Sequence, residues 1–529
     1  MNGRGCFSGI RLPADPREDM PPRIPSPTVP RPRASTLRNR ALAECAAGAQ
    51  ALAAGRTDAA FRRYAAAITL APHDADVAAV HGVALRDAGR LLDAQRELIR
   101  AITLDTTRAD SYTQLAQTFL MVQDHAQAAN AFLAAATLQI TNPVAWRDAT
   151  EALRLAHRIA DGVQIGRHAI ALDHRNPSIA NTLALLLHRS GAIDEALALC
   201  VRVRAHAPDD RNLALTHAML LRTCEQHVEG WALLERRLER PELIQRPFPP
   251  SSPRWDGAPL QHRHILVRGE QGLGDQVQFV RWAAHLRSRG ASRITVQCAP
   301  PLVRLLETLE GVDAVVPSDA CAPAHDVHVD VMSLPHLLQA GGDMHSRMVP
   351  YLRAPVVNAA LAARLQAAPR NGRLRVAMVW GGTPAHTEDR SRSMPLAALL
   401  PVLLQPDLQV VVVQHGSSRQ QLDMLTPDQR EHFIDLATDC RDMADTAQVL
   451  AQCDVLLSVD TSVAHVAGAL GLPTWVMVAH PAEWRWGRDR TDCLFYPHTT
   501  VLRQHAGGDW SAVVNAVRAM LEAWRDAHR

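Results

Sequence analysis

A spacing of 34 residues runs through the first half of the chain and limits what it can fold into. Small residues recur with this period in two series, one starting at Gly48 and one at Ala60. Small side chains let two helices pack closely, and a period held over several copies is typical of stacked helical repeats. The second series consists of Ala60, Ala94, Ala128, Gly162, Ala196 and Gly230. We therefore predict an all-α solenoid of about six helix pairs over residues 41–245, with residues 143–176 as the poorest copy.

Turn residues follow the same period, with glycines at 55, 89 and 191 and prolines at 72 and 208. In period and in the placement of small residues, the array resembles the tetratricopeptide repeat (TPR) family. The resemblance implies a concave groove that binds a protein partner, without naming that partner.

Proline-rich segments flank the array. Residues 1–40 carry eight Arg against three acidic residues and cannot form a core, so we expect a disordered leader. Residues 246–260, "RPFPPSSPRWDGAPL", contain prolines that end the helical pattern, so we expect a linker there.

Composition excludes several classes of protein. All 56 basic residues are Arg, so Walker A loops and Schiff-base chemistry are excluded, because both need Lys. A net charge of +2 does not indicate nucleic-acid binding. The nine cysteines form no CxxC pair, and neither a signal peptide nor a membrane span is evident, so we expect a cytoplasmic protein.

Beyond residue 260, apolar strands alternate with helices, which is typical of parallel α/β sheets. Two such series follow one another, so we predict Rossmann-like domains over residues 261–370 and 371–529, the second ending in an amphipathic helix. A cleft between two such domains is a common place for a ligand.

The first domain opens with the glycine loop "GEQGLGDQVQF", residues 269–279. Gly272 and Gly274 permit a tight turn from strand to helix, and Asp275 falls near the start of that helix. Two interpretations of Asp275 stay open, an N-cap of the helix or a general base facing the cleft.

In the second domain, a buried strand ends on the polar residues Asp460, Thr461 and Ser462, and His465 follows one turn inside the next helix. The N-terminus of a helix favours an anion, and the hydroxyl groups and the imidazole add donors. The alternative is that a hydroxyl caps the helix and His465 is a satisfied core histidine. Capping does not explain Asp460 and His465 together.

The motifs "GLGD" and "VDTSVAH", in this order, resemble glycosyltransferase family 9, the heptosyltransferase-like group. Residues from about 255 to 525 are similar to that family. The stretch "WGGTPAHTEDRSRSMPLAAL", residues 380–399, resembles its basic segment, with Gly381 in the loop and Arg392 where Lys is usual.

The resemblance implies a GT-B fold of two Rossmann-like domains, with an acceptor on the first and a nucleotide-sugar donor on the second. It implies an inverting transfer without metal or cofactor, with Asp275 as the base and the 460–465 segment and Arg392 holding the donor. Ser462 stands where the family usually has Gly, and Arg392 where it has Lys, so the donor need not be ADP-heptose.

Two further stretches of the second half carry clustered charged, aromatic or histidine residues. "EWRWGRDR", residues 483–490, makes Glu483 and Arg485 further candidates for contact with the nucleotide or the sugar. "HDVHVD", residues 325–330, places His325 and His328 on opposite faces of a strand, so we predict no metal site there.

The sequence predicts a glycosyltransferase that uses a nucleotide-sugar as substrate and a hydroxyl of a protein or glycan as acceptor, with the array recruiting the acceptor or a partner. O-GlcNAc transferases share this layout, but only as an analogy of architecture. Two alternatives stay open: a non-catalytic TPR scaffold with a degenerate transferase domain, and a glycan-polymer enzyme that the array docks to a complex.

Overall fold

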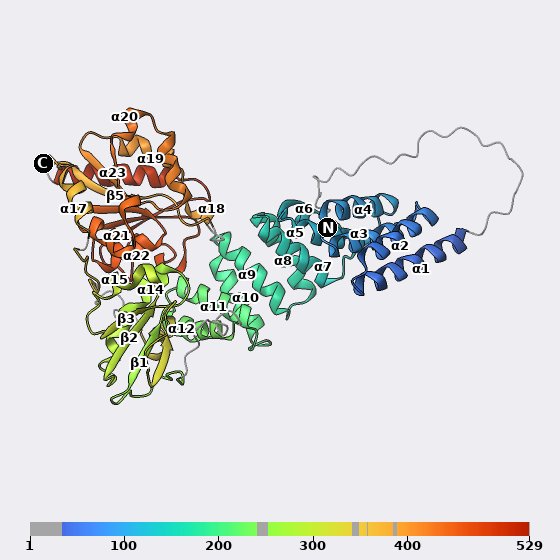
Figure 1. Cartoon of the computed structure of the whole chain (residues 1–529), viewed down its shortest axis with the longest axis horizontal. Coiled ribbons are helices and arrows are strands. Elements are labelled where there is room, and N and C mark those ends of the chain that lie inside the picture. Colours follow the sequence, from blue (N-terminus) through green and yellow to red (C-terminus); the bar gives the residue numbers. More distant parts are fainter. Residues whose placement is uncertain (1–33, 241–251, 341–348, 357, 385–388, 528–529) are drawn as a thin grey trace, which may run out of the picture. The chain divides into compact units, whose positions relative to one another are not determined.

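The computed structural model describes residues 34–240, 252–340, 349–356, 358–384 and 389–527 (Figure 1). The chain divides into two compact units, Met1–Asp124 and His125–Arg529. Among the described residues, every helix is too short or too polar to cross a bilayer.

Twelve helices fill the described part of the chain from residue 34 to residue 234. They are α1 (Ala34–Ala53), α2 (Thr57–Leu70), α3 (Ala75–Asp87), α4 (Leu91–Leu104), α5 (Ala109–Met121), α6 (His125–Leu138), α7 (Pro143–Leu155), α8 (Ile159–Leu172), α9 (Pro177–Arg189), α10 (Ile193–Arg204), α11 (Arg211–Thr223) and α12 (His227–Leu234). From α3 to α11, every second helix begins 34 residues after the one before it, and α2 to α12 keep the same step. The predicted TPR-like repeat is therefore present in the structure.

Two local devices set this repeat. The side chains that accept hydrogen bonds from the first turn of α3, α7, α9 and α11 are Asp74, Asn142, Asn176 and Asp210. Each turn inside a helix pair contains one residue whose backbone has a positive φ, in the left-handed region. These residues are Gly55, Gly89, Gln123, His157, Gly191 and Glu225. The poorly matching fourth copy keeps both devices, so it folds like its neighbours despite its weaker sequence pattern.

The array begins earlier than predicted. Residues 1–33 of the predicted leader lie outside the described residues, but residues 34–40 are helical rather than disordered. The last proline of the leader is Pro32, and Arg38 pairs with Asp74 at 2.8 Å, which ties the start of α1 to the next repeat.

The predicted linker is also shorter than expected. Residues 246–251 lie outside the described residues. Beyond them, the Trp255 N–H donates to the His328 carbonyl at 2.7 Å, and the Trp255 side chain is buried. Residues 252–260 therefore belong to the first α/β domain.

The first α/β domain is a parallel sheet of four strands in the order β3-β2-β1-β4. Its elements are β1 (His264–Arg268), α14 (Leu273–Phe279), η2 (Val280–Leu286), β2 (Arg293–Cys298), η3 (Pro300–Leu302), α15 (Val303–Leu306), β3 (Ala314–Pro317), β4 (Val327–Asp330), η4 (Val331–Ser333) and α16 (Leu334–Leu337). The helix expected after the glycine loop begins at Leu273 and continues as the 3₁₀ segment η2.

The second domain is a parallel sheet of six strands in the order β10-β9-β8-β5-β6-β7. Its strands are β5 (Leu374–Val379), β6 (Leu408–Val412), β7 (Phe433–Asp435), β8 (Val455–Val459), β9 (Thr474–Val478) and β10 (Thr499–Arg503). Its helices are α17 (Ala359–Gln366), α18 (Asp389–Arg392), α19 (Leu396–Leu403), η6 (Ser417–Met424), α20 (Pro427–Arg430), η7 (Ala437–Asp439), α21 (Met443–Leu450), α22 (Ser462–Ala469), η8 (Trp484–Trp486) and α23 (Ser511–Ala527).

The strand order of the second sheet is that of a Rossmann domain. All of its strands are parallel, and the topological switch point, where the order of the strands reverses, lies between β5 and β8. In the first sheet the switch lies between β1 and β4. The two Rossmann-like domains predicted for the C-terminal half are therefore present, and their switch points open at the carboxyl ends of the strands that carry the predicted motifs.

Within the second unit, the last helix pair of the array shares a core with both sheets. Trp231 on α12 meets Phe279 of the first domain and Trp484 of the second at ring distances of 5.6 and 5.3 Å, both edge to face. The end of the array is therefore part of the α/β core.

A buried ion pair reinforces this junction. Arg237, in the 3₁₀ turn η1 (Glu235–Glu239), donates from Nε and Nη2 to the Glu270 carboxylate at 2.9 and 2.6 Å. Both side chains are almost fully buried, at 1% and 0% exposure. Burial alone would lower the pKa of Arg237, but the hydrogen bond and charge of Glu270 raise it above its ordinary value.

We expect Glu270→Gln to lower the free energy of unfolding by about 3 kcal/mol, because the buried Arg237 guanidinium loses its two-point contact with a carboxylate and keeps only the Glu235 carboxylate, at 2.7 Å, as a counter-charge. The thermal midpoint of the full-length chain measures this. Glu310→Gln is the control, because its pair with Arg353 is 77% and 75% exposed and should contribute little. Equal shifts in the two variants would contradict the prediction.

Candidate active site

A cavity of about 1550 Å³ lies at the carboxyl ends of β1, β5 and β8. The structure brings all of the predicted site residues to its wall. They are Gly272, Gly274, Asp275, Gly381, Arg392, Asp460, Thr461, Ser462, His465, Glu483 and Arg485. Their chemical roles stay predictions.

Helix α22 begins at Ser462, on the cavity wall, as predicted. Thr461 is the N-cap residue, with extended backbone, but its side chain makes no capping hydrogen bond. Its Oγ1 lies 3.3 Å from Ser458 Oγ instead. Of the two hydroxyl groups that could cap the helix, that of Thr461 therefore does not, and the helix presents its positive end to the cavity.

His465 is buried behind this helix end. Its Nδ1 shares a hydrogen bond with the Tyr496 hydroxyl at 3.0 Å, and its ring stacks on Trp486 at 5.6 Å. Burial lowers the pKa of His465 well below its ordinary value, and the charges of Arg485 and Arg281 act in the same direction. The imidazole is therefore neutral at physiological pH. Its Nδ1 atom has a hydrogen-bond partner, as the interpretation of His465 as a satisfied core histidine expects.

The other edge of His465 faces the glycine loop of the first domain. A Cβ atom on Gly274 would lie 2.6 Å from His465 Cδ2 and 3.5 Å from Ser462 Cα. Only glycine allows this approach, so the two motifs that are almost 200 residues apart in sequence pack directly against each other.

Asp275 holds two contacts. Its Oδ2 accepts from the N–H of the N-cap residue Gly272 at 3.0 Å, so Asp275 acts from the third position of the helix rather than as the N-cap itself. Its Oδ1 is ion-paired with Arg485, and its side chain is 19% exposed. Asp275 therefore caps the helix and faces the cavity.

Arg485 links the two domains. Its Nη1 donates to Glu483 at 2.6 Å, and its Nη2 and Nε reach Asp275 and Gln278 of the first domain. Burial would lower the pKa of Arg485, but the surrounding carboxylates, Glu483 first, raise it. Burial raises the pKa of the Glu483 carboxyl; Arg485 opposes the rise and Asp460 adds to it. Glu483 is therefore a second carboxyl group at the cavity wall, ion-paired with Arg485.

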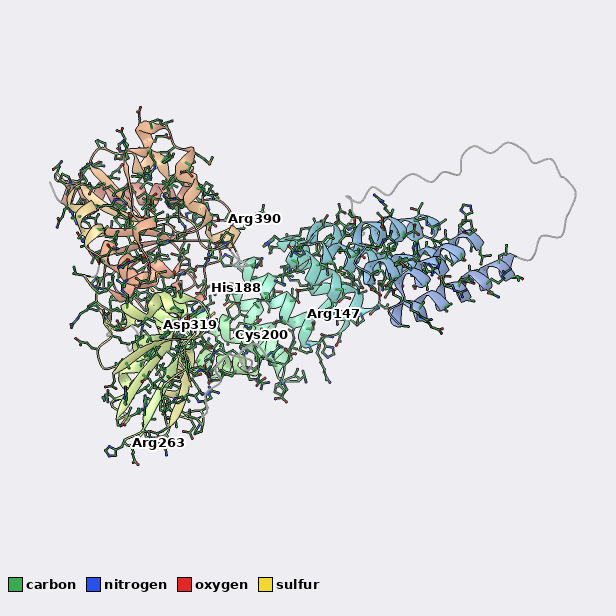
Figure 2. All side chains as sticks on the ribbon, in the orientation of Figure 1. Arg147, His188, Cys200, Arg263, Asp319 and Arg390 are labelled. Carbon is green, nitrogen blue, oxygen red and sulfur yellow. The ribbon has the colours of Figure 1, made fainter. Side chains whose placement is uncertain are left out.

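Arg392 ends α18 and pairs with Asp389 at 3.3 Å, with 19% of its side chain exposed. A Cβ on Gly382 would meet its guanidinium at 2.5 Å, so the loop after β5 packs closely against it. Figure 2 labels its neighbour Arg390, which lines the same cavity.

Sequence reasoning missed Gln414. Its Oε1 accepts from the N–H groups of Trp380 and Gly381 at 2.9 and 2.8 Å, and its Nε2 donates to the Gly381 carbonyl at 2.9 Å. The signal was present, because Gln414 is a polar residue just after a buried strand, as Asp460 is.

It also missed the residues of the helical array on the cavity wall, among them Leu185, His188 and Met219. The sequence does not show which face of a repeat meets the α/β domains. Within the described ranges, His, Cys, Asp and Glu side chains form no group of three suited to a metal ion.

We expect Gly274→Ala to destabilise the chain by about 1–3 kcal/mol, because the new methyl group overlaps the His465 ring. Gly272→Ala, in the same loop, is the matched control, since its Cβ meets only Asp275 Oδ2, at 3.1 Å. Thermal midpoints of both variants measure the difference. Tolerance of alanine at 274 and not at 272 would show that the contact with His465 is not tight.

Residues 394–477 match the model of glycosyltransferase family 9 (heptosyltransferase). Protein FlbA of Caulobacter vibrioides is 22% identical over 356 residues, which cover 63% of this chain and 59% of that protein. The chain thus spans less than two thirds of the length of that curated relative.

Two solved structures are similar to part of the chain. YrrB, described as a TPR protein with an unusual peptide-binding site, is 16% identical and covers 33% of this chain and 91% of its own, with a TM-score of 0.30. PilF of Pseudomonas aeruginosa is 18% identical and covers 40% of this chain and 96% of its own, with a TM-score of 0.32. Residues 394–477, within the second α/β domain, thus match glycosyltransferase family 9, and the helices before the two sheets repeat with the TPR-like step of 34 residues.

Proposed function

We propose that the protein transfers a sugar from a nucleotide-sugar donor to a hydroxyl group of an acceptor, with inversion and without a metal ion. The proposal rests on one observation. The uncapped end of α22, Arg392 and Asp275 all lie on the wall of the same cavity.

The donor side of the proposal is the second domain. A diphosphate at the start of α22 would meet the helix N-terminus and the Thr461 and Ser462 hydroxyls, and Arg392 would offset its charge. Neutral His465, through its hydrogen bond with Tyr496, would hold the first turn of α22 in place.

The reaction itself needs a base on the other side of the sugar. Asp275 would take the proton of the acceptor hydroxyl, whose oxygen then bonds to the anomeric carbon. The bond from that carbon to the diphosphate oxygen breaks, and the nucleoside diphosphate leaves with its electron pair. The acceptor hydroxyl would have to displace Arg485 from Asp275 Oδ1, and Glu483 lies beside Arg485 to receive that guanidinium.

The array would recruit the acceptor or a partner, and the acceptor is a protein or a glycan. The alternative is a scaffold that binds a nucleotide or nothing and catalyses nothing. The two experiments below separate these cases.

We expect one class among ADP-, UDP-, GDP- and dTDP-sugars to raise the thermal midpoint of the full-length chain, since a ligand that binds only the folded state stabilises it. Arg392→Gln should weaken this binding by about 10-fold or more, because it loses a charge-assisted contact. Arg518→Gln, exposed on α23 and away from the cavity, is the control. No shift with any nucleotide sugar would favour the scaffold.

We expect Asp275→Asn to lower turnover of the bound donor by about 10²–10⁴-fold, the usual contribution of a general base, while donor affinity changes little. Nucleoside diphosphate release, followed with EDTA present, is the readout. Glu483→Gln is the comparison: a larger loss there than in Asp275→Asn would make Glu483 the base, and binding without turnover in all three proteins would favour the scaffold.

A further inference from the structure

The cavity has a wall that neither sheet supplies. Arg154 at the end of α7, Leu185, His188 and Arg189 near the end of α9, and Met219 on α11 all line it. Figure 2 labels His188 on α9. All of these residues belong to the second compact unit, which also holds both sheets.

These positions are equivalent in the repeat. Leu185 and Met219 are 34 residues apart, and Arg154, His188 and Arg222 follow one another with the same step. The wall is therefore one continuous face of the first helices of three successive repeats. The first residue of α8, Ile159, extends this face.

This face reaches residues 483–490, the segment that carries Glu483 and Arg485. Arg222, the last member of the basic series, is buried with its guanidinium 4.3 Å from the Trp484 ring, next to Glu483 and Arg485. Ion pairs hold the same segment to the array. Arg488 binds Asp194 at 2.8 Å, and Arg490 binds Glu225 at 3.1 Å. The wall thus stands in a fixed position beside the carboxyl groups of the site.

We propose that this face of the last three repeats is the acceptor subsite, and that the acceptor is an extended polypeptide segment whose Ser or Thr hydroxyl reaches Asp275. The inference rests on the proposed transferase function and gives it a substrate class.

The chemistry of the wall favours a polypeptide. Leu185, Met219 and Ile159 offer half-buried apolar surface that would pack against the side chains of a peptide, and methionine adapts to varied partners. Arg154 is ion-paired with Glu151 at 2.6 Å and Arg189 contacts His157 at 3.2 Å, so these two guanidinium groups are held in place beside the apolar surface. The residues that the array contributes to the wall include no Phe, Tyr or Trp on which a sugar ring could stack.

The test uses the full-length chain and the nucleotide sugar that stabilises it. The probes are 13-residue peptides with one central Ser or Thr and randomised flanks, together with a panel of soluble oligosaccharides. Leu185→Glu and Ile159→Glu alter the wall, and Leu172→Glu places the same charge on α8 outside the cavity. Each variant is measured for sugar transfer, for donor hydrolysis without acceptor and for stabilisation by the donor.

We expect the wild type and Leu172→Glu to modify a subset of the peptides, and the wall variants to lose about 10-fold or more in kcat/KM for them. Donor hydrolysis and stabilisation by the donor should be unchanged in the wall variants. If Leu185→Glu does not fold, Ile159→Glu at the first position of α8 decides the question.

Two results would overturn the acceptor subsite while leaving the donor half of the proposed function intact. In the first, the wall variants transfer sugar to the peptides as fast as the wild type does. In the second, the wild type hydrolyses the donor but transfers sugar only to oligosaccharides, or to none of the probes. If no nucleotide sugar binds or turns over in the wild type, the proposed function fails, and the subsite fails with it.

Discussion

The arrangement of the site depends on one buried ion pair, Arg237 with Glu270. A carboxylate with no exposed surface is tolerated only when its lone pairs are used, and Glu270 accepts from Arg237 twice and from the Met332 N–H at 3.0 Å. Arg237 in turn donates to Ser333 at 2.8 Å. Arg237 is also ion-paired with Glu235 of its own turn at 2.7 Å, so Glu270 is the carboxylate that joins this turn to the glycine loop. The loop that carries Asp275 is therefore fixed to the last repeat.

Periodic features could be predicted from the sequence because local rules set them. Strands alternate with helices beyond residue 260 as the apolar runs predicted, and the small residues of the repeat are buried as expected. The start of α1 was missed because it depends on a tertiary contact, the pair of Arg38 with Asp74. The fourth repeat shows the converse case, in which neighbouring copies and a capping Asn142 impose a fold that its own sequence indicates weakly.

The candidate residues of the site could be predicted, but not the contacts among them. Parallel sheets bring the carboxyl ends of their strands to one edge, so polar residues that follow apolar strands must gather there. The partner of Asp275 is 210 residues away, at Arg485, and no local pattern joins them. The same holds for Leu185, which is an ordinary residue of a repeat until the fold places it on the cavity wall.

The absence of lysine and the geometry of the site are connected through Arg485. Its guanidinium lies 4.4 Å from the Trp484 ring, while its edge donates to Asp275, Glu483 and Gln278 in three directions. Only a planar group can lie against an aromatic ring and still point N–H donors along its plane at several acceptors; an ammonium is a point charge on a flexible stem. Arg485 thus orients carboxyl groups from both domains at once. In a chain whose cations are all guanidinium groups, this planar geometry holds the two halves of the site in register.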